Sequence, residues 1–401
     1  MLVFAGSWAL LHRGFYRHDQ IVDTPVYQHY GELMADGKVP YRDFAVEYPP
    51  GALVPFVLPS LGARQRSAED YRRRFEFLMV LCGCAAIAGM ALVLVGLGAG
   101  PVALAGTLAF TALAPLALGP VIQTRFDLLP AALMVGALAA IVHERPKLGL
   151  GLLGAGTAVK VFPAVILPLA LAYVWRRRGA REAVLAAAVF AVVVGAALLP
   201  FVLVAPHGVF HTFDSQLRRP LQIESLGAAS LAAAHHVGGV AVQMHASFGS
   251  ENLTGHAAQA LARAQAGVQA AAVLAIWIWF ALRPRAPREL VAASAGAVCA
   301  FIAFGKVLSP QFLVWLIPLV PLVRGRRGVA ASAILAAALV LTQLWFPQHY
   351  WDYAARFDPR ETWLVLARDV VLVALAIVLV AGSRRMDGAA PGRGSATGQE
   401  P

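Results

Sequence analysis

The chain has 401 residues, of which 59% are hydrophobic and only 14% are charged, and its mean hydropathy is +0.66. A soluble domain cannot bury that much apolar sequence, so the composition excludes a soluble protein and predicts an all-α polytopic membrane protein. The formal net charge of +11 does not indicate a nucleic-acid partner, because the arginines stand in short clusters between apolar runs, as in cytoplasmic loops.

Twelve apolar runs predict about 12 transmembrane helices with both termini in the cytoplasm. In chain order they are 1–11, 75–98, 101–118, 128–142, 148–159, 161–175, 183–204, 265–282, 289–303, 311–323, 329–346 and 363–382. The basic residues that orient them are Arg176, Arg177, Arg178, Arg181, Arg283, Arg285, Arg288, Arg324, Arg326, Arg327, Arg384 and Arg385. The run 1–11 makes only about half a span. Either the chain starts upstream of Met1 or packing completes this helix, and a cleaved signal peptide is not predicted.

The proline-rich stretch 51–62 predicts a re-entrant or interfacial helix. If it crossed the membrane, every later basic cluster would lie outside, against the positive-inside rule. The arginines in 63–74 are then expected to lie along lipid headgroups on the outer side.

Residues 148–175 predict two short helices that meet at Lys160. Lys160 and Pro163 stand in the middle of this run, and proline interrupts the hydrogen-bond ladder of a helix. Basic loops at both ends of the run also place its two ends on the same side of the membrane.

The domain prediction is a single transmembrane domain over 1–382, with outer loops 12–74 and 205–264 forming the active-site face. Residues 383–401 predict a disordered cytoplasmic tail. The three cysteines all lie in apolar runs, so neither a disulfide framework nor a metal site is predicted.

Charged residues at the edges of apolar runs are candidates for function, because a charge in a membrane is expensive. The predicted topology places six of them at the outer leaflet: Arg125, Asp127, Lys160, Lys306, Arg368 and Asp369. A lysine ammonium at the membrane edge suits a phosphate or pyrophosphate. The alternative is a lysine that only anchors a helix end by snorkelling.

The two outer loops supply further candidates. In the first loop, Asp23 and Asp43 are flanked by aromatic and proline residues ("VDTPVY", "PYRDF"), and a carboxylate in a partly desolvated cleft is a natural general base. In the second loop, Arg218, Arg219, Gln222 and Glu224 suit sugar hydroxyls or a phosphate. The alternative for "FDSQLRRP" is an amphipathic helix at the membrane surface.

Six motifs together resemble glycosyltransferase family 87 of the GT-C superfamily over residues 20 to 320. They are "DTPVY", "GKVPYRDFAVEYPP", "RFDLLP", "AVKVFP", "RPLQIES" and "GKVLSPQF". The resemblance implies a GT-C-like membrane enzyme that takes a sugar, typically mannose, from a polyprenyl-phosphate donor on the extracytoplasmic face. It implies a glycolipid or lipoglycan acceptor, and neither a cofactor nor a divalent metal.

The resemblance also implies roles for individual residues. A first-loop aspartate is the expected base, and Asp23 is the best match, with Asp43 second. Substrate binding is expected of Arg42, Asp43, Glu47, Tyr48, Arg125, Asp127, Lys160, Arg218, Arg219, Gln222, Glu224, Lys306 and Gln311. The competing hypothesis is a transporter or flippase of lipid-linked sugars, which would place its charges nearer the bilayer midplane and show repeated halves.

Overall fold

Long apolar helices dominate the computed structural model, which describes residues 1–17, 21–61, 67–282 and 286–381. Six of these helices are long and apolar enough to cross a membrane: α4 (Ala68–Gly96), α5 (Pro101–Leu118), α10 (Ala180–Val204), α13 (His256–Ala281), α16 (Gly325–Gln343) and α18 (Pro359–Ala381). The predicted tail 383–401, residues 63–66 of the basic stretch, and Arg283, Arg285, Arg384 and Arg385 lie outside the described residues.

The other expected spans form shorter helices, so the count of twelve spans and the GT-C-like fold stay predictions. These helices are α1 (Leu2–Leu10), α7 (Leu128–Val142), α8 (Pro146–Val159), α9 (Leu167–Arg178) and α14 (Pro287–Ala303). The run 311–323 is not one helix but three short turns: Pro310–Phe312, α15 (Leu313–Leu316) and Val320–Leu322.

The remaining elements lie between these helices. The short helices are α2 (Thr24–Ala35), α3 (Leu53–Val57), α6 (Val121–Thr124), α11 (Pro206–Arg218), α12 (Leu226–Gly238) and α17 (Tyr350–Arg356), with 3₁₀ turns at Gly14–Arg17, Pro50–Ala52, Leu58–Ser60 and Phe162–Ile166. A small antiparallel sheet, in the order β1-β3-β2, comprises β1 (Leu221–Gln222), β2 (Met244–Ser247) and β3 (Ser250–Leu253).

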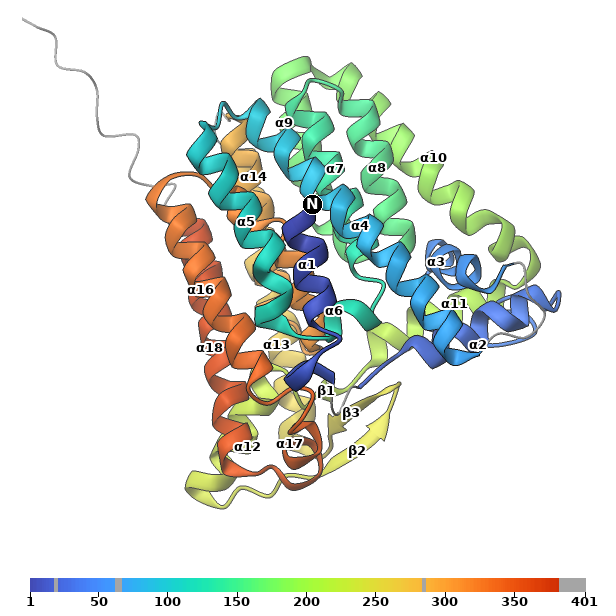
Figure 1. Cartoon of the computed structure of the whole chain (residues 1–401), viewed down its shortest axis with the longest axis vertical. Coiled ribbons are helices and arrows are strands. Elements are labelled where there is room, and N and C mark those ends of the chain that lie inside the picture. Colours follow the sequence, from blue (N-terminus) through green and yellow to red (C-terminus); the bar gives the residue numbers. More distant parts are fainter. Residues whose placement is uncertain (18–20, 62–66, 283–285, 382–401) are drawn as a thin grey trace, which may run out of the picture.

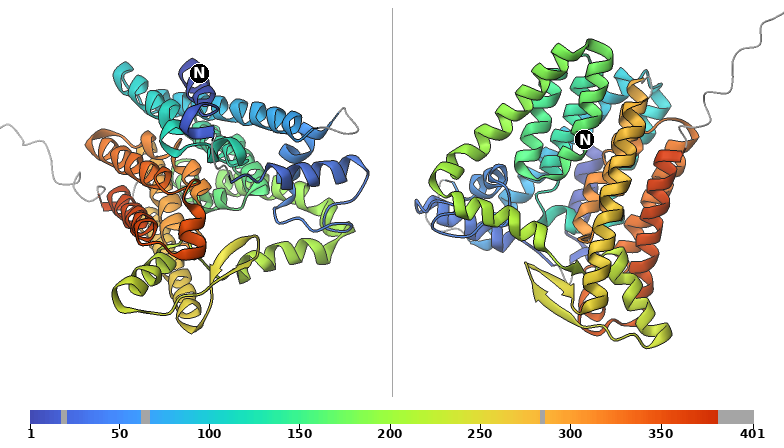
Figure 2. Two further views of the ribbon diagram at one scale, coloured as in Figure 1. Left: turned by 60° about the horizontal axis from the view of Figure 1, so that its bottom comes forward. Right: turned by 180° about the vertical axis from the view of Figure 1, so that it is seen from behind.

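The short helices α2, α3, α11, α12 and α17 and the small sheet lie toward one end of the bundle of longer helices (Figure 1). In Figure 1, α2, α3 and α11 lie together at the right, and the sheet, α12 and α17 lie at the bottom. Figure 2 shows the same grouping from behind, where α11 runs beside α2 and α3 below α10. Most of the two predicted outer loops therefore lies on one side of the helices.

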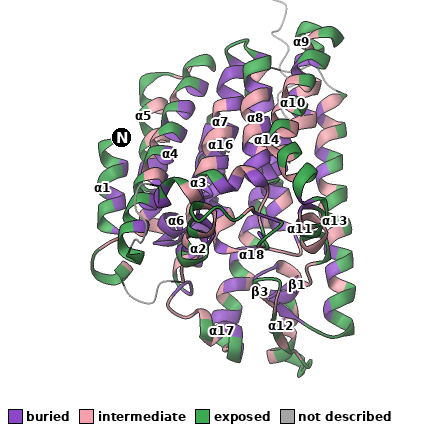
Figure 3. Cartoon of the chain, turned by 90° about the vertical axis from the view of Figure 1, so that its right-hand side faces the viewer, coloured by how far each residue is buried: buried purple, intermediate pink, exposed green. Residues whose placement is uncertain are grey.

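Burial separates a central group of helices from a peripheral one. Most of α7 is buried, whereas only Ala183 and Ala186 are buried in the 25 residues of α10. Figure 3 shows this contrast between a mostly buried α7 and the exposed faces of α10 and α13. Apolar helices with exposed sides need lipid around them, which agrees with the membrane prediction.

The predicted break at Lys160 is confirmed, the structure has the helical alternative for most of "FDSQLRRP", and several predicted bounds are wrong, the largest at the expected span 265–282, which begins at His256. The run 148–175 is broken at Lys160, whose backbone is extended between α8 and the turn Phe162–Ile166. Residues "FDSQLR" belong to the helix α11. The expected span 75–98 begins earlier than predicted, because Ser67 caps the helix by accepting a hydrogen bond from the Asp70 backbone N–H. Arg72, Arg73 and Arg74 are therefore part of α4.

Candidate active site

The site begins with an ion pair between Asp23 and Arg125. Asp23 directly precedes α2, and Arg125 directly follows the short helix α6. Arg125 Nη1 contacts Asp23 Oδ2, and the Tyr27 hydroxyl donates to the same oxygen at 3.3 Å. Arg125 is only 6% exposed. Burial lowers the pKa of Arg125 to about 10, and the charges of Asp127 and Glu224 oppose this shift.

A second ion pair, between Asp127 and Lys160, lies beside the first. The helices α7 and α8 form an antiparallel hairpin, and Asp127 precedes the first helix while Lys160 follows the second. Because the two helices have 15 and 14 residues, the open end of the hairpin brings these side chains together. Lys160 Nζ donates to Asp127 Oδ1 at 2.6 Å.

Aromatic rings enclose this second pair. Lys160 Nζ lies 4.8 Å from the centre of the Phe126 ring, 5.3 Å from that of Trp315 and 5.5 Å from that of Phe312. The indole N–H of Trp315 donates to the same oxygen of Asp127. The Phe126 ring also packs on Tyr27, with centroids 5.6 Å apart. Phe126 therefore joins the two ion pairs.

The stretch "VEYPPG" packs the first loop against the end of α8. A Cβ on Gly51 would lie 2.5 Å from the Ala158 carbonyl oxygen, so only glycine allows this approach. The contact holds the ring of Tyr48 edge-on to Phe126, with centroids 5.0 Å apart. It thereby places Tyr48 next to the ring that Lys160 contacts.

The second loop packs on the first through α11. The Thr212 hydroxyl donates to the Val46 carbonyl at 2.7 Å, and Gln216 Nε2 donates to the Glu47 carbonyl at 3.2 Å. A Cβ on Gly249, between β2 and β3, would lie 3.1 Å from the Glu47 carboxylate. Glu47 thus lies between α11 and the β2–β3 hairpin.

Arg219 is a half-buried guanidinium that forms no ion pair with a carboxylate of the described residues. Its Nη2 donates to Ser250 Oγ at 2.8 Å, and its Nε is buried without a hydrogen-bond partner among these residues. Burial lowers the pKa of Arg219, while the charges of Glu47 and Glu224 oppose this shift.

The segment 221–225 is fixed from several elements. Arg368 of α18 donates to the Glu224 carbonyl at 2.8 Å, the Tyr353 hydroxyl donates to the Ile223 carbonyl at 2.6 Å, and the Gln222 N–H donates to the Lys306 carbonyl at 3.0 Å. Gln222 Nε2 also donates to the Glu224 carboxyl. Burial raises the pKa of Glu224 to about 8, although Arg368 and Arg125 act to lower it.

Buried polar atoms without partners mark where this cluster has capacity for a polar ligand. Among the described residues they include Arg125 Nε, Asp127 Oδ2, Arg219 Nε, Gln222 Oε1 and Gln311 Oε1. Native structures rarely leave such atoms unpaired, so several within one cluster indicate a place where another molecule supplies the hydrogen bonds.

Three of the predicted site residues, Arg42, Asp43 and Arg218, face away from this cluster, whereas Lys306 lies at its edge, where burial and the charge of Arg219 lower its pKa. Arg42 and Asp43 pair with each other on an exposed turn, where Asp43 Oδ2 also accepts from the Val39 N–H at 2.7 Å. The Arg42 side chain and this N–H lower the pKa of Asp43 to about 2. Arg218 is exposed and pairs with Asp214 at 2.7 Å. Lys306, partly exposed, donates to the Leu217 carbonyl at 2.8 Å.

Residues that the sequence reasoning missed line the same cluster, namely Tyr27, Phe126, Trp315 and Ser250. Phe126 stands between two predicted residues in "RFDLLP", and Tyr27 follows Asp23 by one helical turn, so both carried a usable signal. Trp315 and Ser250 carried none, because they reach the site from distant parts of the chain.

The described residues contain one group of side chains suited to a metal ion. It comprises His349, Asp352 and Glu361, whose ligand atoms lie within 4.8 Å of one another. Arg356 already pairs with Asp352, which competes with a cation. The expectation of a metal-independent reaction stays a prediction.

A comparison with protein families adds an independent finding. The family described as glycosyltransferase family 87 matches residues 46–310. That range includes Glu47, Arg125, Lys160 and the second loop, and it begins after Asp23. No curated protein matches the chain.

Proposed function

The chain belongs to glycosyltransferase family 87, and from this premise we propose the donor, the acceptor and the residues of its reaction. Membership makes the protein a membrane glycosyltransferase, which also favours an enzyme over a transporter or flippase. The proposed donor is a hexose, mannose by the family resemblance, linked to polyprenyl phosphate. The proposed acceptor is a glycolipid or lipoglycan at the extracytoplasmic face of the cell membrane.

The proposed base is Asp23. Its carboxylate takes the proton of an acceptor hydroxyl, whose oxygen forms a bond to the anomeric carbon of the donor sugar. The bond from that carbon to the phosphate oxygen breaks, and its electron pair leaves with the polyprenyl phosphate. Attack opposite the leaving group inverts the anomeric carbon. The ion pair with Arg125 and the hydrogen bond from Tyr27 support this assignment, because they fix the carboxylate at the edge of the cluster.

The leaving phosphate needs cations that are not already neutralised. Arg219 carries this role best, since it is half-buried, lacks a carboxylate partner among the described residues and has an unpaired N–H. Arg125 contributes through its own unpaired Nε. Lys160 is less available, because Asp127 and three rings surround its ammonium.

The sugar hydroxyls are assigned to the fixed segment of the second loop. Gln222 Oε1 is a buried acceptor without a partner among the described residues, and burial raises the pKa of the neighbouring Glu224 to about 8, so that its carboxyl is mostly protonated at neutral pH. A neutral carboxyl both donates and accepts, as recognition of a sugar hydroxyl requires. Glu47 and Tyr48 form the opposite wall.

The test is transfer of labelled mannose from polyprenyl-phosphate mannose to an extracted glycolipid fraction in reconstituted vesicles. We expect Asp23→Asn to lower turnover by on the order of 10²–10⁴-fold, as loss of a general base does. Asp43→Asn is the matched control and should transfer like the wild type. Near wild-type turnover of folded Asp23→Asn contradicts the base. Transfer from a nucleotide sugar without the lipid donor contradicts the donor.

A further inference from the structure

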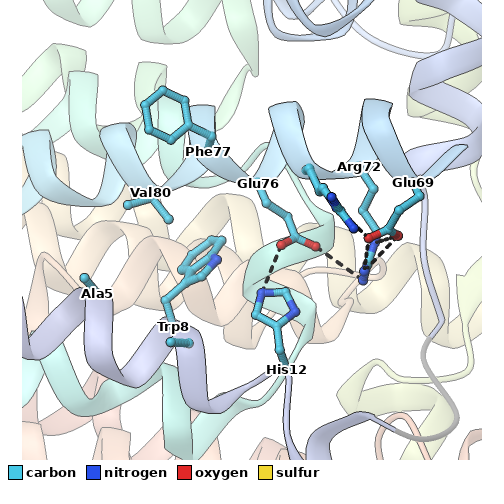
Figure 4. A pocket seen from close by; sticks show the side chains of 10 residues that line it. Ala5, Trp8, His12, Glu69, Arg72, Glu76, Phe77 and Val80 are labelled. Carbon is cyan, nitrogen blue, oxygen red and sulfur yellow. Dashed lines mark hydrogen bonds and ion pairs between the residues drawn. The ribbon is translucent and has the colours of Figure 1, made fainter. Parts of the chain in front are cut away.

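A hollow of about 450 Å³ lies between α1 and the first half of α4, apart from the residues assigned above. One end is apolar and is lined by Ala5, Trp8, Phe77 and Val80. Figure 4 shows these side chains on one side of the hollow. Ala5 and Ala9 lie one helical turn apart on α1, and their small side chains line the hollow together with Phe77 of α4.

The other end of the hollow is charged. It is lined by Glu69, Arg72, Arg73 and Glu76 of α4, and by His12. Arg72 pairs with Glu69 at 3.0 Å and with Glu76 at 3.5 Å, and His12 Nε2 lies 3.1 Å from Glu76 Oε2 (Figure 4). Burial and the charge of Arg72 lower the pKa of His12. Burial raises the pKa of Glu76 to about 7, although the charge of Arg72 acts to lower it. A bound cation favours the ionised form of Glu76, and with Glu76 ionised the two carboxylates and two guanidinium groups of this charged end, the mouth of the hollow, cancel in charge.

The two ends of the hollow match the depth profile of a membrane. The helix α4 has 29 residues, or about 43 Å at 1.5 Å per residue, whereas the hydrocarbon core is about 30 Å thick. From Phe77 to Gly96 no residue is charged, so this part fills the hydrocarbon. The first nine residues, 68–76, which are about 13 Å long and carry the charged mouth, therefore lie at headgroup depth, and the apolar end lies below them.

Glu76 gives the mouth its specificity. Its side chain is nine-tenths buried, and Oε1 forms no hydrogen bond with any described residue, its ion-pair partner Arg72 Nη1 being 3.5 Å away. A buried carboxylate oxygen in this state requires an N–H or O–H donor. The adjacent Arg73, whose side chain is 71% exposed, donates its Nε–H to Glu69 at 2.9 Å, and its Nη groups offer further donors for an anion.

We propose that this hollow binds one membrane phospholipid whose headgroup carries a phosphate diester and a primary ammonium, as in phosphatidylethanolamine. The ammonium donates to Glu76, the phosphate accepts from Arg73, and one acyl chain lies between Phe77 and the small residues of α1. A net-neutral mouth of mixed charge complements such a zwitterion. An anionic headgroup has no net electrostatic attraction to a mouth whose charges cancel. A quaternary ammonium has no N–H group and therefore cannot donate a hydrogen bond to Glu76.

The hollow also contacts the catalytic side. Gln123 of α6 is fully buried, donates to the Trp8 carbonyl at 3.1 Å and lies 3.1 Å from His12 Nε2. Gln123 stands two residues before Arg125. A bound lipid would therefore hold α1 and α6 together behind the Asp23–Arg125 pair. The proposal itself concerns lipid binding and does not depend on the transferase assignment.

The experiment measures lipid retention by native mass spectrometry, on full-length protein taken from vesicles with equal amounts of phosphatidylethanolamine, phosphatidylcholine and phosphatidylglycerol. We expect one retained phosphatidylethanolamine, preferred about tenfold over each of the other two, as for one charge-assisted hydrogen bond. Glu76→Gln should remove the preference over phosphatidylcholine. Ala9→Leu, which fills the apolar end, should lower the retention of every lipid.

Ala88→Leu is the matched control, because it enlarges an exposed alanine of α4 away from the hollow and should leave retention unchanged. Equal retention of the three lipids by the wild type, or a preference for phosphatidylglycerol, overturns the proposal. It is also overturned if Ala9→Leu and Ala88→Leu behave alike. If Glu76→Gln does not fold, the proposal is still tested by the lipid preference of the wild type and by the difference in retention between Ala9→Leu and Ala88→Leu.

Discussion

The two halves of the candidate site use charge in opposite ways. On the α7–α8 side, Asp127 and Lys160 neutralise each other inside a cage of rings. On the second-loop side, Arg219 has no carboxylate partner among the described residues, and Gln222 keeps an unpaired oxygen. A buried pair whose charges already cancel mainly adds structure, although Asp127 Oδ2 can still accept a hydrogen bond, whereas a cation without a counter-charge is available to an anionic ligand. Charge in an apolar setting is therefore a poor guide to function until its partners are known.

The sharpest test of this comparison is the neighbouring pair Arg218 and Arg219. We expect Arg219→Ala to lower kcat/KM for sugar transfer by on the order of 10²–10³-fold, as loss of one cation at a developing charge does. Arg218→Ala should stay within about threefold, because that side chain is exposed and pairs with Asp214. Equal losses in the two variants would show that Arg219 has no special access to the substrate.

The Asp127–Lys160 pair should respond in stability more than in chemistry. Removing one partner, as in Asp127→Ala or Lys160→Met, is expected to cost about 3–5 kcal/mol because it leaves a buried charge unpaired. The double variant Asp127→Leu/Lys160→Met should cost less than either single change. Thermal unfolding in detergent measures this order. Full stability with lost transfer in Lys160→Met would instead place Lys160 on the substrate.

The raised pKa of Glu224 predicts that the free energy of unfolding depends on pH. Burial raises its pKa to about 8 in the folded state, so the folded protein holds a proton that the unfolded chain releases near pH 4.5. The resulting stabilisation is complete below pH 4.5 and is lost as pH rises through 8, up to about 5 kcal/mol. Unfolding midpoints from pH 4 to 9 should fall for the wild type and stay flatter for Glu224→Gln, which remains neutral. Parallel curves would contradict a protonated Glu224.

The smallest effect is expected on the exposed turn of the first loop. Arg42→Ala should leave transfer within about twofold of the wild type, because its charge is matched by Asp43 in water. The same vesicle assay checks this. A loss as large as that of Arg219→Ala would move the sugar site from the second loop to this turn.

Composition and pattern predicted the helices better than the contacts between them. The bounds 101–118 and 128–142 and the break at Lys160 are confirmed, since apolar runs and proline act locally. The start of α4 was placed too late, because charge was taken as the end of the helix although Ser67 caps it.

The site was less accessible to sequence reasoning, for a physical reason. The α7–α8 hairpin could have paired Asp127 with Lys160, since one residue precedes and the other follows two helices of nearly equal length. By contrast, Arg218 and Arg219 are equivalent in sequence, and only the end of α11 turns one outward and the other toward Ser250. The β2–β3 hairpin was also not expected, because its strands are short and mostly polar.

The buried pair Arg368–Asp369 has a consequence for how the protein is made. These side chains lie near the middle of α18, are fully buried and pair at 2.7 Å. Each charge at the centre of a lone helix raises the free energy of membrane insertion by about 2.5–3.5 kcal/mol. The last long helix is therefore expected to enter the bilayer only when Trp345 and the Glu224 carbonyl are already in place to receive Arg368. Insertion of α18 is then coupled to the contact that also fixes the second loop.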